Sequence, residues 1–237
     1  MSSVGIICNS HNLPVTFATV NWWVLAAVVV LVGALALVAY WQLVVAEGAY
    51  LGQRVVTLLY DLFALRYDGV KQFDATYDAL TLAHPVMRHL AATGQKDGRV
   101  LDVATGTGRL PAALFAQASF AAHVRAIDTS QKMLAVARQN LAHIDPSRLR
   151  LEAMDALDLH FDGAGFDVVT CLEALEFMPS AQTAISEMLR VLKPGGLLLL
   201  TNRVGGDVWK LPGRTMPTSR FAASLSALGL NSIEHEQ

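Results

Sequence analysis

The chain of 237 residues has few of the residue types on which several common functional sites depend. Its only cysteines are Cys8 and Cys171, which is too few for a disulfide framework or a cysteine-based zinc site. Charged residues make up 16% of the chain and the formal net charge is −2, so the composition gives no electrostatic argument for a nucleic-acid partner. We therefore expect no nucleic-acid partner and no metal site, and we interpret Cys171 as a small buried strand residue.

Charge is entirely missing from one long segment near the N-terminus. The run WWVLAAVVVLVGALALVAYWQLVVA, residues 22–46, has no charged residue and one amide, Gln42. About 20 apolar residues suffice for a helix to cross the hydrocarbon core of a bilayer. Trp22 and Trp23 at one end and Tyr40 and Trp41 at the other are typical of aromatic belts at both interfaces. The pattern predicts a transmembrane helix over residues 22–46.

Basic residues are missing before this segment and present after it. Residues 1–21 contain no Lys or Arg, whereas a cleaved signal peptide begins with a basic region, so we interpret the segment as an uncleaved anchor. The first positive residues after it are Arg54, Arg66 and Lys71. The positive-inside rule then places the C-terminal side in the cytoplasm. We expect a single-pass membrane protein whose larger, C-terminal part is cytoplasmic.

Residues 47–97 are predicted to be a helical linker or cap. The stretch YLGQRVVTLLYDLFALRYDG, residues 50–69, has apolar residues at helical spacing and a narrow polar stripe. Its broad apolar face favours a helix that lies on the membrane surface or caps the following domain, and simple packing on that domain is equally compatible. A second helical stretch covers residues 73–93. The apolar positions are Leu51, Val55, Leu58, Leu62 and Leu65, and the polar ones are Gln53, Arg54, Thr57, Asp61 and Asp68.

From residue 98 to the C-terminus, apolar strands alternate with helical segments. This alternation predicts an α/β domain with a doubly wound, mostly parallel sheet and helices on both faces. In such sheets, ligands bind beyond the carboxyl ends of the strands. The segment LKPGG, residues 192–196, is expected to end a helix and turn into the fifth strand. The strands are expected near residues 99–103, 124–128, 149–153, 166–171 and 196–202.

The end of the chain leaves little room for further strands. Residues 218–230 read as the helix after the fifth strand, and NSIEHE, residues 231–236, as a sixth strand. No residues remain for a seventh strand, so we expect either a shortened sheet or another element over that edge. An uncovered edge would be open to pairing, which makes an oligomer through this edge one expectation.

The glycine-rich turn after the first strand lacks the features of two common nucleotide sites. The run Gly106-Thr107-Gly108-Arg109-Leu110-Pro111 has proline where a dinucleotide fold needs its third glycine, which disfavours an NAD-dependent oxidoreductase. A Walker-type phosphate loop is also missing. What the sequence does have is an acid in or at the end of each of the first three strands: Asp102, Asp128 and Asp155.

Five segments in order resemble the class I S-adenosylmethionine-dependent methyltransferases. VLDVATGTG (100–108) resembles the first motif of that family, AIDTSQKMLAVARQNL (126–141) the ribose-binding segment, and AMDALDL (153–159) the adenine segment. FDVVTCLEALEFM (166–178) and MLRVLKPGGLLLLTN (188–202) resemble its fourth and fifth strands. The resemblance covers residues 98–202. Within the family, this segment is similar to ubiquinone and menaquinone methyltransferases. It implies a Rossmann-like methyltransferase domain over residues 98–237 that binds S-adenosylmethionine.

The resemblance also implies roles for individual residues. Asp128 would accept hydrogen bonds from both ribose hydroxyls, and Asp155 would accept from the adenine amino group or order its loop, close to the backbone of Ala156. The glycines would let the turn approach the methionine portion, and Asp102 would order this loop or reach the ammonium through water. Thr129 or Ser130 is expected to cap the next helix. The implied cofactor-binding residues are Asp102, Ala104, Gly106, Gly108, Asp128, Thr129, Asp155 and Ala156.

The catalytic residues are less well defined by the sequence. Glu173 and Glu176 follow the fourth strand and His160 follows the third, so each is a candidate base for removing a proton from the acceptor. Many family members have a histidine near the position of Glu176, which this chain lacks, and an ion-paired acid is the alternative interpretation of Glu176. Tyr67 resembles the aromatic residue that closes over the cofactor in members with small-molecule substrates, although an ordinary helix aromatic would look the same.

Together these features predict a membrane-anchored methyltransferase with four parts: an N-terminal tail (1–21), a transmembrane helix (22–46), a helical cap (47–97) and the S-adenosylmethionine-binding domain (98–237). An anchor suits an acceptor that stays in or beside the bilayer, such as a quinone-like ring or a lipid headgroup. The alternative is a non-catalytic membrane module that binds S-adenosylmethionine or serves as an interaction surface.

Overall fold

The computed structural model describes residues 21–71, 73–203 and 205–230 of the chain. The chain forms two compact units, Met1–Ala39 and Tyr40–Gln237. The predicted sixth strand, residues 231–236, and Cys8 lie outside the described residues.

Helix α1 (Trp22–Tyr40) is apolar throughout and buries none of its side chains. It continues as the π-helical turn η1 (Trp41–Val45). Among the described residues, Trp22–Val45 is the one helical stretch long and apolar enough to cross a membrane. The last turn differs from the prediction, because Trp41 belongs to the second unit and stacks on Tyr50 with ring centroids 5.3 Å apart.

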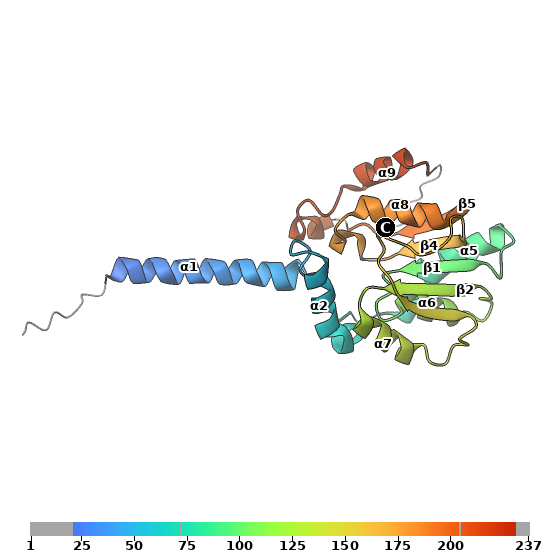
Figure 1. Ribbon diagram of the computed structural model, residues 1–237, viewed down its shortest axis with the longest axis horizontal. Coiled ribbons are helices and arrows are strands. Elements are labelled where there is room, and N and C mark those ends of the chain that lie inside the picture. The colour runs from blue at the N-terminus through green and yellow to red at the C-terminus, as the bar shows by residue number, and fades with distance from the viewer. Residues whose placement is uncertain (1–20, 72, 204, 231–237) are drawn as a thin grey trace, which may run out of the picture. The chain divides into compact units, whose positions relative to one another are not determined.

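A parallel sheet organises the second unit (Figure 1). The strands β1 to β5 stand in the order β3-β2-β1-β4-β5, so the strand order reverses between β1 and β4. The predicted doubly wound sheet is therefore confirmed for the described residues. The strands are β1 (Arg99–Val103), β2 (His123–Asp128), β3 (Leu149–Ala153), β4 (Phe166–Cys171) and β5 (Leu192–Leu200).

The start of β5 corrects one sequence prediction. Helix α8 (Ala181–Val191) runs directly into β5, so LKPGG lies within the strand element rather than before it. The pairing with β4 jumps from Phe166–Leu192 to Val168–Leu197, and Gly195 has a φ of 78°. The segment keeps the two strands paired on either side of a bulge because glycine tolerates this backbone conformation.

Two hydrophobic clusters cover the faces of the sheet. On one face, Val100 and Val168 pack with α5 (His84–Ala92), α6 (Arg109–Phe115) and the helix α7 (Gln131–Asn140). On the other face, Leu101 and Val169 pack with α8 and α9 (Thr218–Ala227). Side chains alternate between faces along a strand, so a strand buried on both faces is apolar almost throughout. Cys171 is buried on β4, as predicted.

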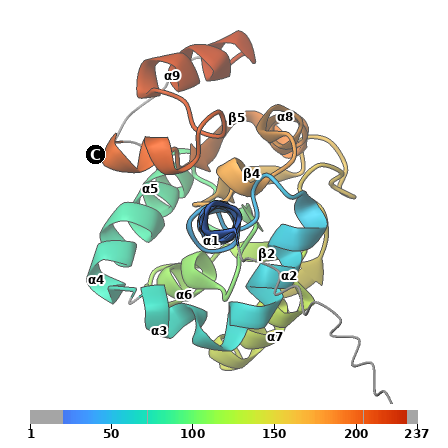
Figure 2. The same ribbon diagram turned by 90° about the vertical axis from the view of Figure 1, so that its left-hand side faces the viewer.

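Residues 53–83 form a helical cap at the carboxyl ends of the strands (Figures 1 and 2). Asp74 accepts a hydrogen bond from the backbone N–H of Tyr77 at 2.7 Å and so begins the second helical stretch. That stretch was predicted as one helix over residues 73–93, and it is continuous apart from a π-helical turn. The elements of the cap are α2 (Gln53–Phe63), η2 (Ala64–Arg66), α3 (Tyr67–Lys71), α4 (Ala75–Asp78) and η3 (Ala79–Ala83).

Helix α2 packs through its polar side rather than its apolar side. Leu58 and Leu62 are 57% and 65% exposed, and Leu65 just beyond the helix is 87% exposed. The polar stripe faces the segment just before α7, where the hydroxyls of Thr57 and Thr129 share a hydrogen bond. The helix therefore packs on the domain, which was one of the sequence interpretations, but Leu58 and Leu62 take no part in that packing. Hydrogen-bonding partners just before α7, Thr129 and Ser130, orient the helix, and Leu58 and Leu62 remain exposed.

Candidate functional site

The loop after β1 has the tight geometry that its small residues allow. Ala104, Gly106 and Gly108 all have positive φ values, of 57°, 57° and 89°. At Gly106 a Cβ atom would meet nothing within 4 Å, so the loop has open space in front of it. At Gly108 a Cβ atom would lie 2.6 Å from Cδ1 of Leu141, a residue just after α7. Gly106 therefore faces free space, whereas Gly108 is required by packing inside the protein rather than by a ligand.

Asp128 connects this loop to the end of β2. Its carboxylate accepts hydrogen bonds from the backbone N–H groups of Gly106 at 2.9 Å and Ser130 at 2.8 Å. Burial raises the pKa of Asp128, and the backbone donors oppose that shift. An ionised carboxylate has about four acceptor positions, so beside the backbone donors of Gly106, Thr129 and Ser130 it keeps acceptor capacity for a ligand hydroxyl. Ser130 caps α7 by accepting from the backbone N–H of Met133 at 3.0 Å, as predicted for Thr129 or Ser130.

Asp102 lies inside the sheet beside Thr170 of β4. The Thr170 hydroxyl donates to Oδ1 of Asp102 at 2.7 Å. Desolvation by burial raises the pKa of Asp102 to about 6, although the hydrogen bond from Thr170 opposes the shift. This position fits the predicted role of ordering the loop after β1.

Asp155 and Ala156 follow β3. The exposed Asp155 accepts a hydrogen bond from the backbone N–H of Leu157 at 3.0 Å, which makes it a turn residue. Ala156 is buried. The backbone N–H of Met154 donates to the carbonyl of Asp128 at 3.1 Å, so this turn is tied to the end of β2. The arrangement is compatible with the second predicted role for Asp155, which is to order the loop.

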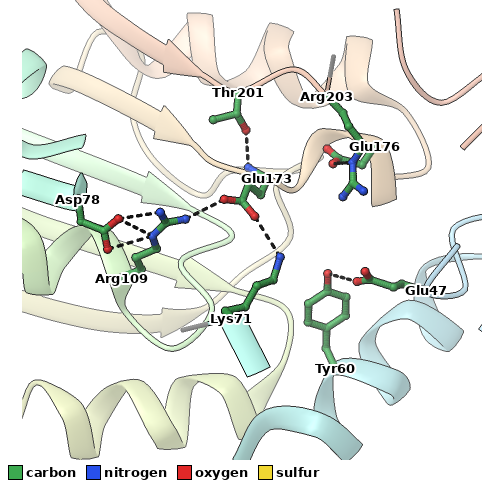
Figure 3. A network of polar contacts seen from close by, with 9 residues as sticks. All are labelled: Glu47, Tyr60, Lys71, Asp78, Arg109, Glu173, Glu176, Thr201 and Arg203. Carbon is green, nitrogen blue, oxygen red and sulfur yellow. Dashed lines mark hydrogen bonds and ion pairs between the residues drawn. The ribbon is translucent and has the colours of Figure 1, made fainter. Parts of the chain in front are cut away.

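An ion-pair network ties the cap to the ends of β1 and β4 (Figure 3). Arg109 contacts Asp78 through Nε at 3.1 Å and through its terminal nitrogen at 2.6 Å, and contacts Oε1 of Glu173 at 2.7 Å. Lys71 contacts Oε2 of Glu173 at 3.1 Å. Sequence reasoning missed Arg109, Asp78 and Lys71, because their partners are 31 to 102 residues away in the chain. The position of Arg109 directly after the glycine pair was the one available signal.

The cap also contacts the loop segments through hydroxyls. Asp61 accepts from the hydroxyl of Ser130, and Asp68 accepts from that of Thr107. Asp68 also accepts from the side-chain amide of Asn140 at 2.9 Å. Each of these acids on α2 and α3 therefore points toward the loops after β1 and β2.

The candidate bases Glu173 and Glu176 differ in their ion-pair partners. Burial alone would raise the pKa of Glu173, but the charges and hydrogen bonds of Lys71 and Arg109 hold it below its usual value. Glu173 is therefore a poor proton acceptor. Glu176 is buried in η4 (Leu175–Phe177) and accepts from Nε of Arg203 at 3.0 Å, as the ion-pair alternative predicted.

His160 is the one candidate that lies at the wrong edge of the sheet. It lines a cavity of about 500 Å³ together with Arg99 and Phe166, which begin β1 and β4. This is the amino edge of the strands, opposite the loops described above. His160 is exposed and contacts Asp158 at 3.3 Å. The suggestion that it acts as the base is therefore wrong.

Tyr67 begins α3 within an aromatic group. Its ring centroid lies 6.0 Å from that of Tyr60 and 6.1 Å from that of Phe73. Burial, followed by the nearby Glu173 charge, raises the pKa of Tyr67, so the phenol stays neutral at physiological pH. Tyr60 donates to Oε2 of Glu47 at 2.7 Å. Aromatic packing therefore accounts for the position of Tyr67 in this structure.

A second cavity, of about 290 Å³, lies at the carboxyl ends of β4 and β5. It is next to the strand reversal between β1 and β4, which is where doubly wound sheets bind ligands. Its lining comes from α3, η4 and the residues that follow β4 and β5: Lys71, Glu173, Glu176, Thr201, Asn202 and Arg203.

Comparisons with known proteins agree with this geometry. A family described as a methyltransferase domain matches residues 100–196. A demethylmenaquinone methyltransferase of Clavibacter sepedonicus is 44% identical over 102 residues, which are 43% of this chain and 40% of that protein. A phosphatidylethanolamine N-methyltransferase of Cereibacter sphaeroides is 32% identical over 142 residues, which are 60% of this chain and 68% of that protein. Among solved structures, the (4+2)-cyclase SpnF aligns with a TM-score of 0.60 and 27% identity, over 75% of this chain and 72% of that one.

The chain thus spans less than half of the first relative and about two thirds of the second. The family match begins in β1 and ends within β5, so it includes the loops that contain Gly106, Asp128 and Glu173. The sheet order, the glycine-rich loop and the second relative lead to the same conclusion: the chain belongs to the class I S-adenosylmethionine-dependent methyltransferases.

Proposed function

We propose that the protein is a membrane-anchored methyltransferase that transfers a methyl group from S-adenosylmethionine to a lipid-soluble or membrane-adjacent acceptor. The membrane part of this proposal rests on the exposed apolar side chains of the cap. In the chain, the cap follows an apolar helix of 24 residues. The two relatives bear the names of lipid acceptors, demethylmenaquinone and phosphatidylethanolamine.

The loops after β1 and β2 have a chemistry that fits the cofactor. Asp128 has acceptor capacity left for ribose hydroxyls, and the open space at Gly106 allows a ligand to approach the backbone. The carbonyls of Ala104 and Gly106 would accept from the ammonium, with Asp102 ordering the loop behind them. Thr129, Asp155 and Ala156 would border the ribose and adenine. When bound, S-adenosylmethionine supplies a methyl group that is already activated on a positively charged sulfur.

Acidic and basic residues of the helical cap lie on different sides, in an arrangement that suits a bilayer surface. Asp61 and Asp68 point inward to Ser130 and Thr107, whereas Arg54 and Arg66 are exposed on the same segment as the exposed leucines. An apolar face that also carries cations favours contact with anionic lipids. The cap would therefore lie between the bilayer and the cofactor loops. With the positive residues after the anchor, this domain would be on the cytoplasmic side.

An assay with the full chain in vesicles tests the proposal. The protein is incubated with labelled S-adenosylmethionine and a membrane lipid extract, and the label is followed into the lipid fraction. Labelled lipid supports the proposal, and label in a water-soluble product alone contradicts it. Tight binding of the cofactor without any transfer would instead support a non-catalytic membrane module.

A further inference from the structure

The cavity of about 500 Å³ at the amino edge of the sheet is rich in basic side chains. It lies at the opposite edge from the loops after β1 and β2, so it is separate from the site proposed for the cofactor. Cavities of this size are typical of small-molecule sites. Among the described residues, Asp162 is the one carboxylate in its lining. The basic members of the lining are Arg99, His123, Arg125, Arg148, Arg150 and His160.

The strand register gathers three of these arginines on one face of the sheet. Arg125 of β2 lies opposite Leu101 of β1 and Arg150 of β3. Side chains alternate between faces along a strand, so Arg99 shares the face of Leu101 on β1. Like charges directly opposite each other on adjacent strands lower stability. An anion bound beside Arg125 and Arg150 would offset this repulsion.

Two of the four arginines in the lining already have partners within the protein. Arg125 forms an ion pair with Glu152, and Arg148 donates to the backbone carbonyl of Phe120 at 2.7 Å. Arg150, by contrast, makes no hydrogen bond or ion pair with any described residue, and it is exposed. A guanidinium has five N–H donors in a planar fork, which matches the geometry of a phosphate. Arg150 is therefore available to an anionic ligand.

Arg99 is also available, because the acid beside it is already neutralised. Oδ1 of Asp167 accepts from Nζ of Lys193 at 2.7 Å, and Oδ2 accepts from the backbone N–H of Arg99 at 2.8 Å. The guanidinium of Arg99 donates no hydrogen bond to any described residue, and the residue is exposed. Arg99 and Arg150 thus both present their donors at the cavity.

The segment between β3 and β4 forms one wall of the cavity and is fixed to α8. The guanidinium of Arg190 donates to the carbonyls of Phe161 at 2.8 Å and Leu159 at 2.6 Å. The backbone N–H of Gly165 donates to the carbonyl of Val191 at 2.8 Å. None of these bonds uses an arginine of the cavity lining. The wall is therefore formed in advance, and the arginines of the lining are not needed to hold it.

We propose that this cavity binds a small soluble diphosphate, with one phosphoryl group on Arg99 and the other on Arg150. Strands β1 and β3 lie on either side of β2, so the two arginines begin two strand spacings apart, roughly 10 Å. Two linked phosphoryl groups can each meet the arginine of one strand, whereas a single phosphate requires both side chains to lean toward one point. Each contact would be a charge-assisted hydrogen bond, the stronger kind.

The position and surroundings of the cavity favour a small ligand from the aqueous phase. The cap lies at the carboxyl ends of the strands and is the part proposed to face the bilayer, so the amino edge faces away from it. Asp158 and Asp162 lie beside the cavity and would repel a long polyanion such as a nucleic acid. The inference concerns binding at this edge and does not depend on which acceptor is methylated.

The test is titration calorimetry of the full chain in detergent, at constant ionic strength and without magnesium, which would itself bind the probe. The probes are inorganic pyrophosphate, inorganic phosphate and a short-chain phosphatidate, which carries a phosphate on a lipid. We expect pyrophosphate to bind about tenfold or more tightly than phosphate, the scale of one further charge-assisted hydrogen bond. Saturating S-adenosylmethionine should leave the binding of pyrophosphate unchanged.

Two variants connect the binding to the cavity. We expect Arg99→Gln and Arg150→Gln each to weaken pyrophosphate binding about tenfold or more. The matched control is Arg220→Gln on α9, which removes an exposed arginine outside the lining and should leave the affinity unchanged. Melting curves check that all three variants are folded.

Four outcomes would overturn the inference. The first is no binding of pyrophosphate, and the second is equal binding by the wild type and both cavity variants, which would indicate general attraction to charge. Displacement of pyrophosphate by S-adenosylmethionine would place the anion at the other edge of the sheet. Tighter binding of the phosphatidate than of pyrophosphate would assign the cavity to a lipid headgroup instead of a soluble diphosphate.

Discussion

At the scale of single residues, the acids Asp102 on β1 and Asp128 on β2 differ in their partners. Asp102 bonds the Thr170 hydroxyl inside the sheet, whereas Asp128 bonds the backbone of the loops at the strand ends. The sequence placed both acids on their strands correctly. It did not distinguish the interior position from the one at the edge, because that difference depends on which strand lies alongside.

Asp102 should make stability depend on pH. Its pKa is about 6 in the folded protein against an ordinary 3.8, so between these values the folded state holds the proton more tightly than the unfolded state. The free energy of unfolding should therefore fall as the pH rises through this window, by about 3 kcal/mol. Asp102→Asn has no ionisable carboxyl group at this position, so its free energy of unfolding does not fall in this pH window. Its amide oxygen still accepts the hydrogen bond from the Thr170 hydroxyl. We expect the variant to gain about 3 kcal/mol over the wild type between pH 4 and pH 7.

The measurement is urea unfolding of both proteins in detergent at pH 4, 5, 6 and 7. Asp158→Asn serves as the control, because that side chain is 81% exposed. Parallel stability curves for the wild type and Asp102→Asn would contradict the assignment of a raised pKa to Asp102.

Asp128 should contribute to cofactor affinity. Asp128→Ala removes the proposed acceptor of the ribose hydroxyls, and we expect it to weaken S-adenosylmethionine binding by about 1.5–3 kcal/mol, the range for charge-assisted hydrogen bonds. Titration calorimetry measures this change, and a melting curve checks that the variant is folded. Asp158→Ala is the matched control. Full affinity in a folded Asp128→Ala protein would rule out the ribose role.

At the scale of secondary-structure elements, the apolar periodicity of α2 predicted a helix correctly. It did not predict which side of that helix contacts the rest of the domain. The spacing of the leucines predicted the helix, and α2 does extend over Gln53–Phe63. Its apolar side was available for packing on the domain, yet the polar side makes the contacts. Local pattern determines that a helix has two faces, whereas the hydrogen-bonding partners just before α7, Thr129 and Ser130, determine which face turns inward.

The exposed leucines of α2 should matter for membrane substrates. We expect Leu58→Asp or Leu62→Asp to lower turnover of a membrane-borne acceptor at least fivefold, because a buried charge in the bilayer interface is unfavourable. Cofactor affinity should change less than twofold, since both side chains are exposed to solvent. Ser186→Asp on an exposed position of α8 is the control for added charge. Turnover and cofactor affinity are measured on the same vesicle preparation.

Two results would contradict this prediction in different ways. If both leucine variants retained full turnover on membrane substrate, the outer side of α2 would have no role in acceptor access. If they lost cofactor binding together with turnover, the leucines would serve the folding of the domain.

At the scale of the whole molecule, the boundary between the two units comes before the end of the apolar segment. Trp41 stacks on Tyr50, Ala46 is buried with Val56, and Glu47 bonds Tyr60. The sequence set the boundary at residue 46, because hydropathy continues to that point. Contacts within the chain assign Tyr40 and the residues after it to the second unit.

Truncation can separate anchoring from folding. We expect chains that begin at Trp41 or at Gly48 to lose stable membrane association, because both lack α1, and to retain cofactor binding. The chain from Gly48 should be less stable by about 2–4 kcal/mol, since it lacks the Trp41–Tyr50 stack and the Glu47–Tyr60 hydrogen bond. Vesicle flotation after a high-salt wash and calorimetry measure the two effects. Complete retention of the shorter chain in the vesicle fraction would mean that the cap binds membranes by itself.

The sequence by itself determined the sheet and the positions of the loops after β1 and β2, which we propose bind the cofactor. Runs of apolar residues that end at Asp102 and Asp128, with a glycine turn beside them, are local patterns, and each was read directly from neighbouring residues. The Arg109 network, the polar cavity and the orientation of α2 were decided by the tertiary structure alone. Their members come from the cap, from β4 and from β5, so the contacts exist only after distant segments have packed. Charged side chains accept many partners, and a local sequence pattern has no means of choosing among them.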